Sequence, residues 1–261
     1  MFDSHCHLAF DVFEGRVDRV IADARADGVR GMVTISTTTA NASVNLAIAR
    51  RFPNVWCSAG VHPLHAHEPR NWDDLKRVAR DPKCVAWGEL GLDHHYDHPP
   101  RDLQRRVLEE QLAFIRSCAS EGLVKPIVVH CRKSFDALLP VFRASGLDPS
   151  RFVFHCFTGS VQDARNVLDF GAWISYTGVV TFKSAPEVAE AAAITPLDRI
   201  MVETDAPFLS PAPHRSVFPC EPKFVVHTAR FIAARRGMDP DEFERVTDRN
   251  VERFFGITIP A

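Results

Sequence analysis

The sequence lacks any long hydrophobic run, and its apolar stretches are only as long as single β-strands. A membrane-spanning helix needs about 20 apolar residues, so we expect no such helix. The chain begins without a charged segment, an apolar segment or a cleavage site, which predicts a cytoplasmic protein. Its 7 cysteines are an odd number without a CxxC pair, and this pattern predicts reduced thiols rather than disulfides or a zinc knuckle.

The chain also has little net charge. It carries 31 Lys and Arg against 33 Asp and Glu, so no broad positive field surrounds it, and a nucleic-acid partner would need a local basic patch. No linker or low-complexity tract interrupts the 261 residues, and 46% of them are hydrophobic. We therefore expect a single domain over residues 1–261 with a full core.

Short runs rich in valine and isoleucine recur along the chain, with helix-length segments between them. In residues 103–115 the apolar side chains repeat at helical spacing. This α/β alternation, repeated eight times, predicts a (β/α)₈ TIM barrel, whose usual length is about 250 residues. An open doubly wound sheet is the alternative, but no glycine-rich phosphate loop follows any strand. The predicted strands are Phe2–His7, Arg30–Ser36, Val55–Val61, Cys84–Glu89, Ile127–His130, Phe152–His155, Ala172–Tyr176 and Arg199–Thr204.

Side chains of the kind that bind metals stand at the carboxyl ends of several predicted strands, where barrels of this type place their chemistry. Alternate residues of a strand face the same side, so His5 and His7 can both face the barrel axis. Any one such residue would be an ordinary half-buried side chain, but six together predict a centre for zinc, manganese or a similar divalent metal. The six predicted ligands are His5, His7, Glu89, His130, His155 and Asp205. The two oxygens of Glu89 could bridge two ions.

The same segments resemble a known family over nearly the whole chain. The motifs are DSHCHL at the start, GVHP (60–63), GELGLDHHYD (88–97), HCR (130–132), HCFTG (155–159), GVVTFKSA (178–185), ETDAPFLSP (203–211) and NVERFFG (250–256). In this order they are similar to the TatD family of metal-dependent deoxyribonucleases. The resemblance implies an amidohydrolase-like TIM barrel that hydrolyses DNA, commonly as a 3′ to 5′ exonuclease on single strands.

The resemblance also implies how the ligands divide between two metal ions. His5, His7, Glu89 and Asp205 would hold one ion, and Glu89, His130 and His155 the other. A metal ion lowers the pKa of a bound water towards neutrality, and a second ion neutralises the phosphate oxygen and the leaving 3′ oxygen. Glu89 and Asp205 are the predicted catalytic residues, with Asp205 orienting the water or taking its proton. Mg²⁺, Mn²⁺ and Zn²⁺ all suit this ligand set.

Candidate substrate contacts follow the strands. His62 could donate a hydrogen bond to a phosphate, which we favour, or Pro63 could mark a turn with His62 exposed. The loop after the fourth strand could stack on a base or could be hydrated, and cationic side chains near the ligands could meet a phosphodiester. The predicted contacts with DNA, expected as single-stranded 3′ ends, are His62, His94, Tyr96, Arg132, Lys183 and Arg215.

One segment departs from the family pattern. Family members often carry Arg-Gly-Lys and Asn-Glu-Pro after the last strand, whereas residues 213–222 read PHRSVFPCEP and keep only Arg215 and Glu221-Pro222. This leaves substrate choice open. A metal-dependent ester or amide hydrolase, such as a D-aminoacyl-tRNA deacylase, is the alternative enzyme, and a metal-stabilised scaffold is the alternative without activity. We expect neither a membrane nor an obligate protein partner.

Overall fold

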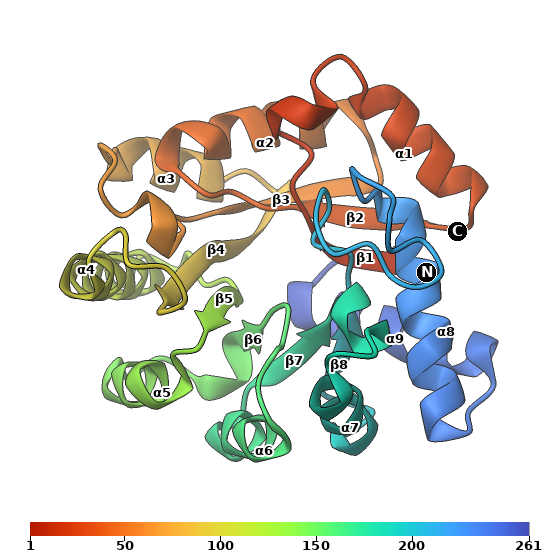
Figure 1. Cartoon of the computed structure of the whole chain (residues 1–261). Coiled ribbons are helices and arrows are strands. Elements are labelled where there is room, and N and C mark those ends of the chain that lie inside the picture. The colour runs from red at the N-terminus through yellow and green to blue at the C-terminus, as the bar shows by residue number, and fades with distance from the viewer. Residues whose placement is uncertain (261) are drawn as a thin grey trace.

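Eight parallel strands form the centre of the molecule in the computed structural model, which describes residues 1–260 (Figure 1). Their order in the sheet is their order in the chain, from β1 to β8. The first strand meets the segment after the last strand through a bridge between Cys6 and Ala206 and through the Asp205 N–H, which donates to the His5 carbonyl at 2.9 Å. The (β/α)₈ barrel predicted from the sequence is therefore confirmed.

All eight predicted strands are present, but their ends differ from the prediction. Six are shorter, whereas β4 and β5 are longer because they stay paired beyond Glu89, up to Asp93 opposite Arg132. Glu89 therefore lies inside β4 and not at its carboxyl end, which corrects the expectation. The strands are β1 (Phe2–Cys6), β2 (Gly31–Thr34), β3 (Val55–Ala59), β4 (Cys84–Asp93), β5 (Ile127–Arg132), β6 (Phe152–Phe154), β7 (Trp173–Tyr176) and β8 (Ile200–Val202).

Helices surround the strands on the outside of the barrel (Figure 1). On the segment predicted to be helical, the apolar face of α4 is buried, including Val107, Leu108 and Ile115. The α-helices are α1 (Val17–Ala26), α2 (Thr39–Arg51), α3 (Trp72–Ala79), α4 (Arg101–Ser120), α5 (Phe135–Ala144), α6 (Val161–Phe170), α7 (Pro186–Ile194), α8 (Val225–Arg236) and α9 (Pro240–Phe255). Short 3₁₀ helices are η1 (Asp11–Phe13), η2 (Pro63–His65), η3 (Pro149–Arg151), η4 (Gly178–Thr181) and η5 (Pro222–Phe224).

The two larger apolar clusters lie on the two sides of the sheet, because alternate strand residues face opposite sides. Residues such as Met32 pack outward against the helices. Val33, Val128 and Met201 belong to a second core that also includes Phe254 of α9. Helix α9 thus packs on the core at the amino ends of the strands, and the carboxyl ends remain for the polar side chains.

Two further features concern composition. All seven cysteines are unpaired, and six of them are buried. Among the helices of residues 1–260, none combines the length and the apolar character that crossing a membrane requires.

Candidate metal centre

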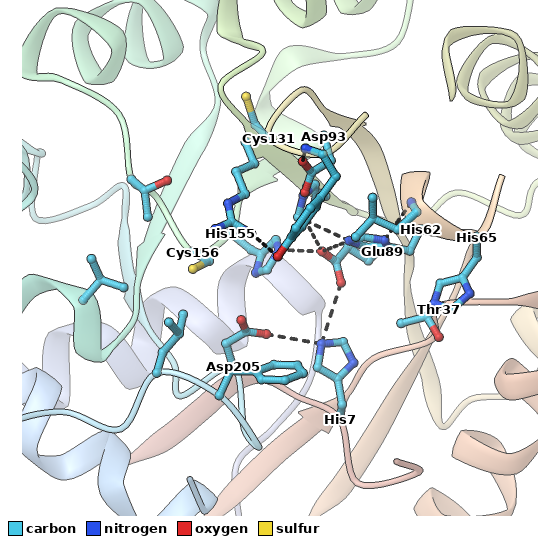
Figure 2. A pocket seen from close by; sticks show the side chains of 18 of the residues that line it. His7, Thr37, His62, His65, Glu89, Asp93, Cys131, His155, Cys156 and Asp205 are labelled. Carbon is cyan, nitrogen blue, oxygen red and sulfur yellow. Dashed lines mark hydrogen bonds and ion pairs between the residues drawn. The ribbon is translucent and has the colours of Figure 1, made fainter. Parts of the chain in front are cut away.

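The six predicted ligands meet at the carboxyl end of the barrel. His5 lies on β1, Glu89 on β4 and His130 on β5, while His7 and His155 directly follow β1 and β6, and Asp205 lies in the segment after β8. Five of the six line a cavity of about 490 Å³, and His5 is fully buried beside them. Figure 2 shows the Glu89 carboxylate with dashed lines to surrounding imidazoles. The five lining ligands are His7, Glu89, His130, His155 and Asp205.

The position of Glu89 depends on the glycine before it. The pairing of β4 with β5 shifts register between Trp87 and Leu90. Gly88 has φ of 121°, a region that side-chain-bearing residues rarely adopt, and a Cβ on it would lie 2.5 Å from the Val128 carbonyl oxygen. Glycine therefore lets β4 approach β5 closely here, and the next residue presents its carboxylate to the barrel axis.

One oxygen of Glu89 faces the ligands from the first and last strands. Oε2 lies 3.4 Å from His5 Nε2 and 3.8 Å from His7 Nε2. Asp205 Oδ1 lies 3.5 Å from His5 Nε2 and 3.2 Å from His7 Nε2. Two imidazole nitrogens and two carboxylate oxygens thus converge on one small space.

The other oxygen of Glu89 faces a different set of imidazoles. Oε1 lies 2.8 Å from His130 Nδ1 and 2.6 Å from His155 Nε2. His62 Nε2 is 3.5 Å from the same oxygen and 3.0 Å from His130 Nδ1. The carboxylate of Glu89 therefore stands between two separate groups of nitrogen atoms, with one oxygen directed to each.

Partners outside the cluster orient the ligand imidazoles. His7 Nδ1 lies 3.2 Å from the Ile35 carbonyl and His130 Nε2 lies 3.0 Å from Asp93 Oδ2. When the two rings are neutral, donation of these N–H groups leaves His7 Nε2 and His130 Nδ1 with lone pairs that face the cluster. His155 Nδ1 lies 3.3 Å from Glu203 Oε1. A carboxylate or carbonyl behind the ring is the usual arrangement for a metal-binding histidine.

His62 is oriented in the opposite sense. Its Nδ1 accepts a hydrogen bond from the Leu64 backbone N–H at 3.1 Å, which uses the lone pair of that nitrogen. A neutral His62 therefore carries its proton on Nε2, the nitrogen that faces Glu89 and His130. Burial lowers the pKa of His62 well below its usual value, and the charge of His130 lowers it further, so the neutral form is favoured. His62 consequently offers the cluster a donor and no lone pair.

The charges within the cluster compensate one another. Burial alone raises the pKa of Glu89, but the charge of His155 and the interactions with the other surrounding imidazoles outweigh burial and hold that pKa well below the usual range. Burial lowers the pKa of His155, yet Glu89 and Glu203 raise it well above normal. The pKa of Asp205 is also lowered, because the hydrogen bond from His7 and the charge of His5 exceed the effect of burial. The carboxylates are thus ionised where cations would bind.

The backbone is strained where the chain leaves two of the strands. Asp205 has φ of 57° and Cys156, directly after His155, has φ of 44°. Non-glycine residues seldom adopt this left-handed conformation, and such strain concentrates at functional sites. The left-handed conformation of Asp205 directs its carboxylate towards His5 and His7.

The predicted substrate contacts divide into two groups. His62, Tyr96 and Arg132 line the cavity. The Arg132 guanidinium lies 5.2 Å from the centre of the Tyr96 ring, and that ring is 47% exposed. By contrast, the cavity lining does not include the other three contacts, which stay predictions. These are His94, Lys183 and Arg215.

Four residues of the site were not assigned a role from the sequence. Asp93 and Glu203 stand behind ligand histidines, and Phe10 and Phe208 line the cavity. The signal for Glu203 was its position two residues before Asp205, since alternate residues share a side. No sequence signal marked Phe10 or Phe208, because a phenylalanine that follows a strand usually belongs to the core.

The donor atoms fit a divalent metal. Three groups each bring three ligand atoms within 4.8 Å of one another: His5, His7 and Asp205; His5, His155 and Glu203; and His62, Glu89 and His130. The last group includes His62 by distance alone, since its Nε2 carries the proton. Imidazoles with carboxylates at the carboxyl end of a (β/α)₈ barrel define a metal-dependent hydrolase.

Comparisons with known proteins agree with this class. The family model for TatD-related DNases matches residues 2–256, and the chain belongs to this family. It is 35% identical over 260 residues to the uncharacterized metal-dependent hydrolase YcfH of Escherichia coli K12, covering 98% of this chain and 96% of the relative. It is 33% identical over 268 residues to the 3′-5′ ssDNA/RNA exonuclease TatD of Klebsiella pneumoniae, covering 99% of each.

A solved structure shows the same likeness. The TatD homologue YJJV of Escherichia coli K12 superposes with a TM-score of 0.90 at 26% identity, covering 99% of this chain and 98% of that chain. The family prediction made from the motifs is therefore confirmed.

Proposed function

We propose that the protein is a 3′ to 5′ exonuclease on single-stranded DNA that works with two divalent metal ions bridged by Glu89. The observation that carries the proposal is the carboxylate of Glu89, whose two oxygens face two separate groups of imidazoles. The name of the Klebsiella relative supports the substrate and the direction.

The residues would divide between the ions as the family resemblance implies. His5, His7 and Asp205 belong to the Oε2 side of Glu89, and His130 and His155 to the Oε1 side. When bound, Mg²⁺, Mn²⁺ or Zn²⁺ would supply an activated water and charge for the phosphate oxygens. The imidazoles are held ready for this by their outer partners Asp93 and Glu203.

His62 acts directly on the substrate, and Asp205 acts directly on the attacking water. The Nε2–H of His62 donates to a non-bridging oxygen of the scissile phosphate, because this donor faces the cavity and its tautomer is fixed by Leu64. Asp205 accepts the proton of the attacking water. Its low pKa keeps the carboxylate ionised, and its place on the cavity wall lets it accept a hydrogen bond from the water and orient it before the phosphorus is attacked.

Aromatic side chains on the cavity wall hold the bases. Tyr96 is exposed at the mouth and is backed by Arg132, while Phe208 is 44% exposed and packs edge-on against Phe10. Rings of this kind stack on any base, which suits a nuclease that must accept every sequence. Arg132 also offers a cation to the phosphodiester.

The test is degradation of a 5′-labelled single-stranded DNA by protein stripped of metal and reloaded with Mg²⁺, Mn²⁺ or Zn²⁺. A ladder that shortens from the 3′ end, present in the wild type and in Glu190→Gln on the exposed face of α7 but absent in Glu89→Ala, is expected. Elemental analysis of the same samples reports metal content.

Absence of cleavage with every metal, despite two bound ions per chain, would discard the nuclease and keep the metal centre. D-aminoacyl-tRNA offered to the same preparation then tests ester hydrolysis. Fewer than two ions per chain in an active wild type would contradict the bridging role of Glu89.

A further inference from the structure

A second hollow of about 420 Å³ lies at the opposite end of the barrel from the metal centre. Its lining comes from the segments just before β5, β6 and β8, from the first residue of β7 and from α9. Because the strands are parallel, these amino ends form one face. The polar lining residues are Lys125, Ser150, Arg151, Asp198, Arg199 and Arg253, and the apolar ones are Val124, Pro126, Trp173 and Phe254.

Four of these lining residues are cations, and their partners are neutral. Lys125 Nζ donates to the Cys84 carbonyl at 2.6 Å, and Arg151 Nε donates to the Lys125 carbonyl at 3.0 Å. Arg253 donates to the Asp198 carbonyl and to the side-chain oxygen of Asn250. None of the four forms an ion pair with a carboxylate of residues 1–260, although many surface cations elsewhere do.

The pKa values of two side chains at or beside the hollow are shifted. Burial lowers the pKa of the Arg151 guanidinium, and the charge of Asp148 only partly opposes this. The pKa of Asp148 is itself lowered, by hydrogen bonds from Ser150 and also by the charges of Arg151 and Arg199. The carboxylates near the hollow are thus outnumbered by cations, and an incoming anion would be attracted.

A largely buried aromatic ring, that of Trp173, lies directly beside the charges. The guanidiniums of Arg199 and Arg253 lie 5.2 Å and 4.7 Å from the centre of the Trp173 ring, and the Phe254 ring packs edge-on with that ring at 5.3 Å between centroids. Val124 at the rim is 57% exposed. A ligand that fills the hollow would therefore meet charge on one part and apolar surface on another, and small-molecule sites of this size are common.

We infer that this hollow, the basic hollow, binds a nucleoside monophosphate, with the phosphate dianion among Arg151, Arg199 and Arg253 and the base against Val124 and the neighbouring apolar wall. The ligand class rests on the proposed function, because a 3′ to 5′ exonuclease releases such nucleotides. The hollow would bind its own product at a place remote from the metal centre.

The test is a titration of the metal-loaded full chain with deoxyadenosine monophosphate, followed through the NMR signal of the Trp173 indole N–H. This group donates to the Ser150 carbonyl at 3.0 Å inside the basic hollow, and Trp173→Phe identifies its signal. The monophosphate is expected to shift the signal in a saturable way, inorganic phosphate to bind more weakly and deoxyadenosine not to bind. Because the signal reports the hollow alone, the result is independent of nuclease activity.

Two variants keep the inference falsifiable. Arg199→Gln/Arg253→Gln should weaken binding about tenfold or more, whereas Arg143→Gln/Arg165→Gln, which removes the same charge from exposed positions on α5 and α6, should not. Val124→Glu places a carboxylate at an exposed rim position and should weaken binding without loss of packing.

No saturable shift with the monophosphate would overturn the site. An equal response to inorganic phosphate would overturn the nucleotide as its ligand, and equal binding by both arginine double variants would show general charge attraction instead of a site. Binding at the hollow in a protein without nuclease activity would leave the site standing and discard only the proposed source of its ligand.

Discussion

The two ends of the barrel are made by the same eight strands but handle charge in opposite ways. At the carboxyl end, buried carboxylates and imidazoles compensate one another, and Glu89 is 2% exposed among its partners. At the amino end, cations such as Arg199 lie over Trp173 without a carboxylate partner among residues 1–260. Buried charge demands compensation, while charge at the surface can leave its donors to solvent. The carboxyl end is therefore suited to metal chemistry and the amino end to binding an anion.

The largest effect should come from the residue at the centre of the carboxyl end. Glu89→Gln keeps the size of the side chain but removes the charge shared by both groups of imidazoles. We expect metal content to fall at both positions and kcat/KM to fall on the order of 10³-fold or more, since bound metals contribute several kcal/mol to the transition state. Elemental analysis and the labelled-DNA assay measure the two effects. Full metal content in the variant would contradict the bridging arrangement.

A smaller effect should come from Asp93, which acts through His130. Asp93→Asn removes the carboxylate that fixes His130 Nε2–H, and metal affinity should fall about 10- to 100-fold. Asp97→Asn, which changes an exposed acid in the loop that follows β4, is the matched control. Competition with a chelator measures the affinity without any assay of activity. If both variants bound metal as tightly as the wild type, Asp93 would have no positioning role.

The aromatic rim should affect binding more than chemistry. Tyr96→Ala and Phe208→Ala each remove one exposed ring from the cavity mouth, and KM for single-stranded DNA should rise about tenfold with kcat little changed, since stacking contributes roughly 1–3 kcal/mol per base. Phe218→Ala, which removes a ring that is 69% exposed outside the cavity lining, should leave KM unchanged. A fall in kcat alone would indicate that the rings position the metal ligands instead.

The smallest effect should come from the amino end. Arg253→Gln removes a cation over Trp173 and should lower the free energy of unfolding by about 0.5–1 kcal/mol, with metal content and kcat unchanged. Arg235→Gln, exposed at the end of α8, should change none of these quantities. Chemical denaturation measures the stability. Loss of metal in the Arg253 variant would show that the two ends are coupled and would break the comparison.

The local pattern predicted the parts of this molecule that depend on neighbours in sequence. Apolar runs located all eight strands, helical spacing located the helix that contains residues 103–115, and the alternation of His5 and His7 placed both imidazoles on one side. The pattern was wrong about β4, because only pairing with β5 shows that the strand continues past Glu89. The single domain, the cytoplasmic location and the absence of an obligate partner stay predictions.

What the sequence by itself determined is the class: a metal-dependent hydrolase of the TatD family on a (β/α)₈ barrel, recognisable because strand order brings distant residues together at one end of the barrel. Only the tertiary structure decided which side-chain atoms face one another. The two directions of the Glu89 carboxylate, the tautomer of His62 fixed by Leu64, and the arginines gathered around Trp173 depend on distances between side chains. Hydrogen bonds and charge interactions act over a few ångströms, so no spacing along the chain specifies them.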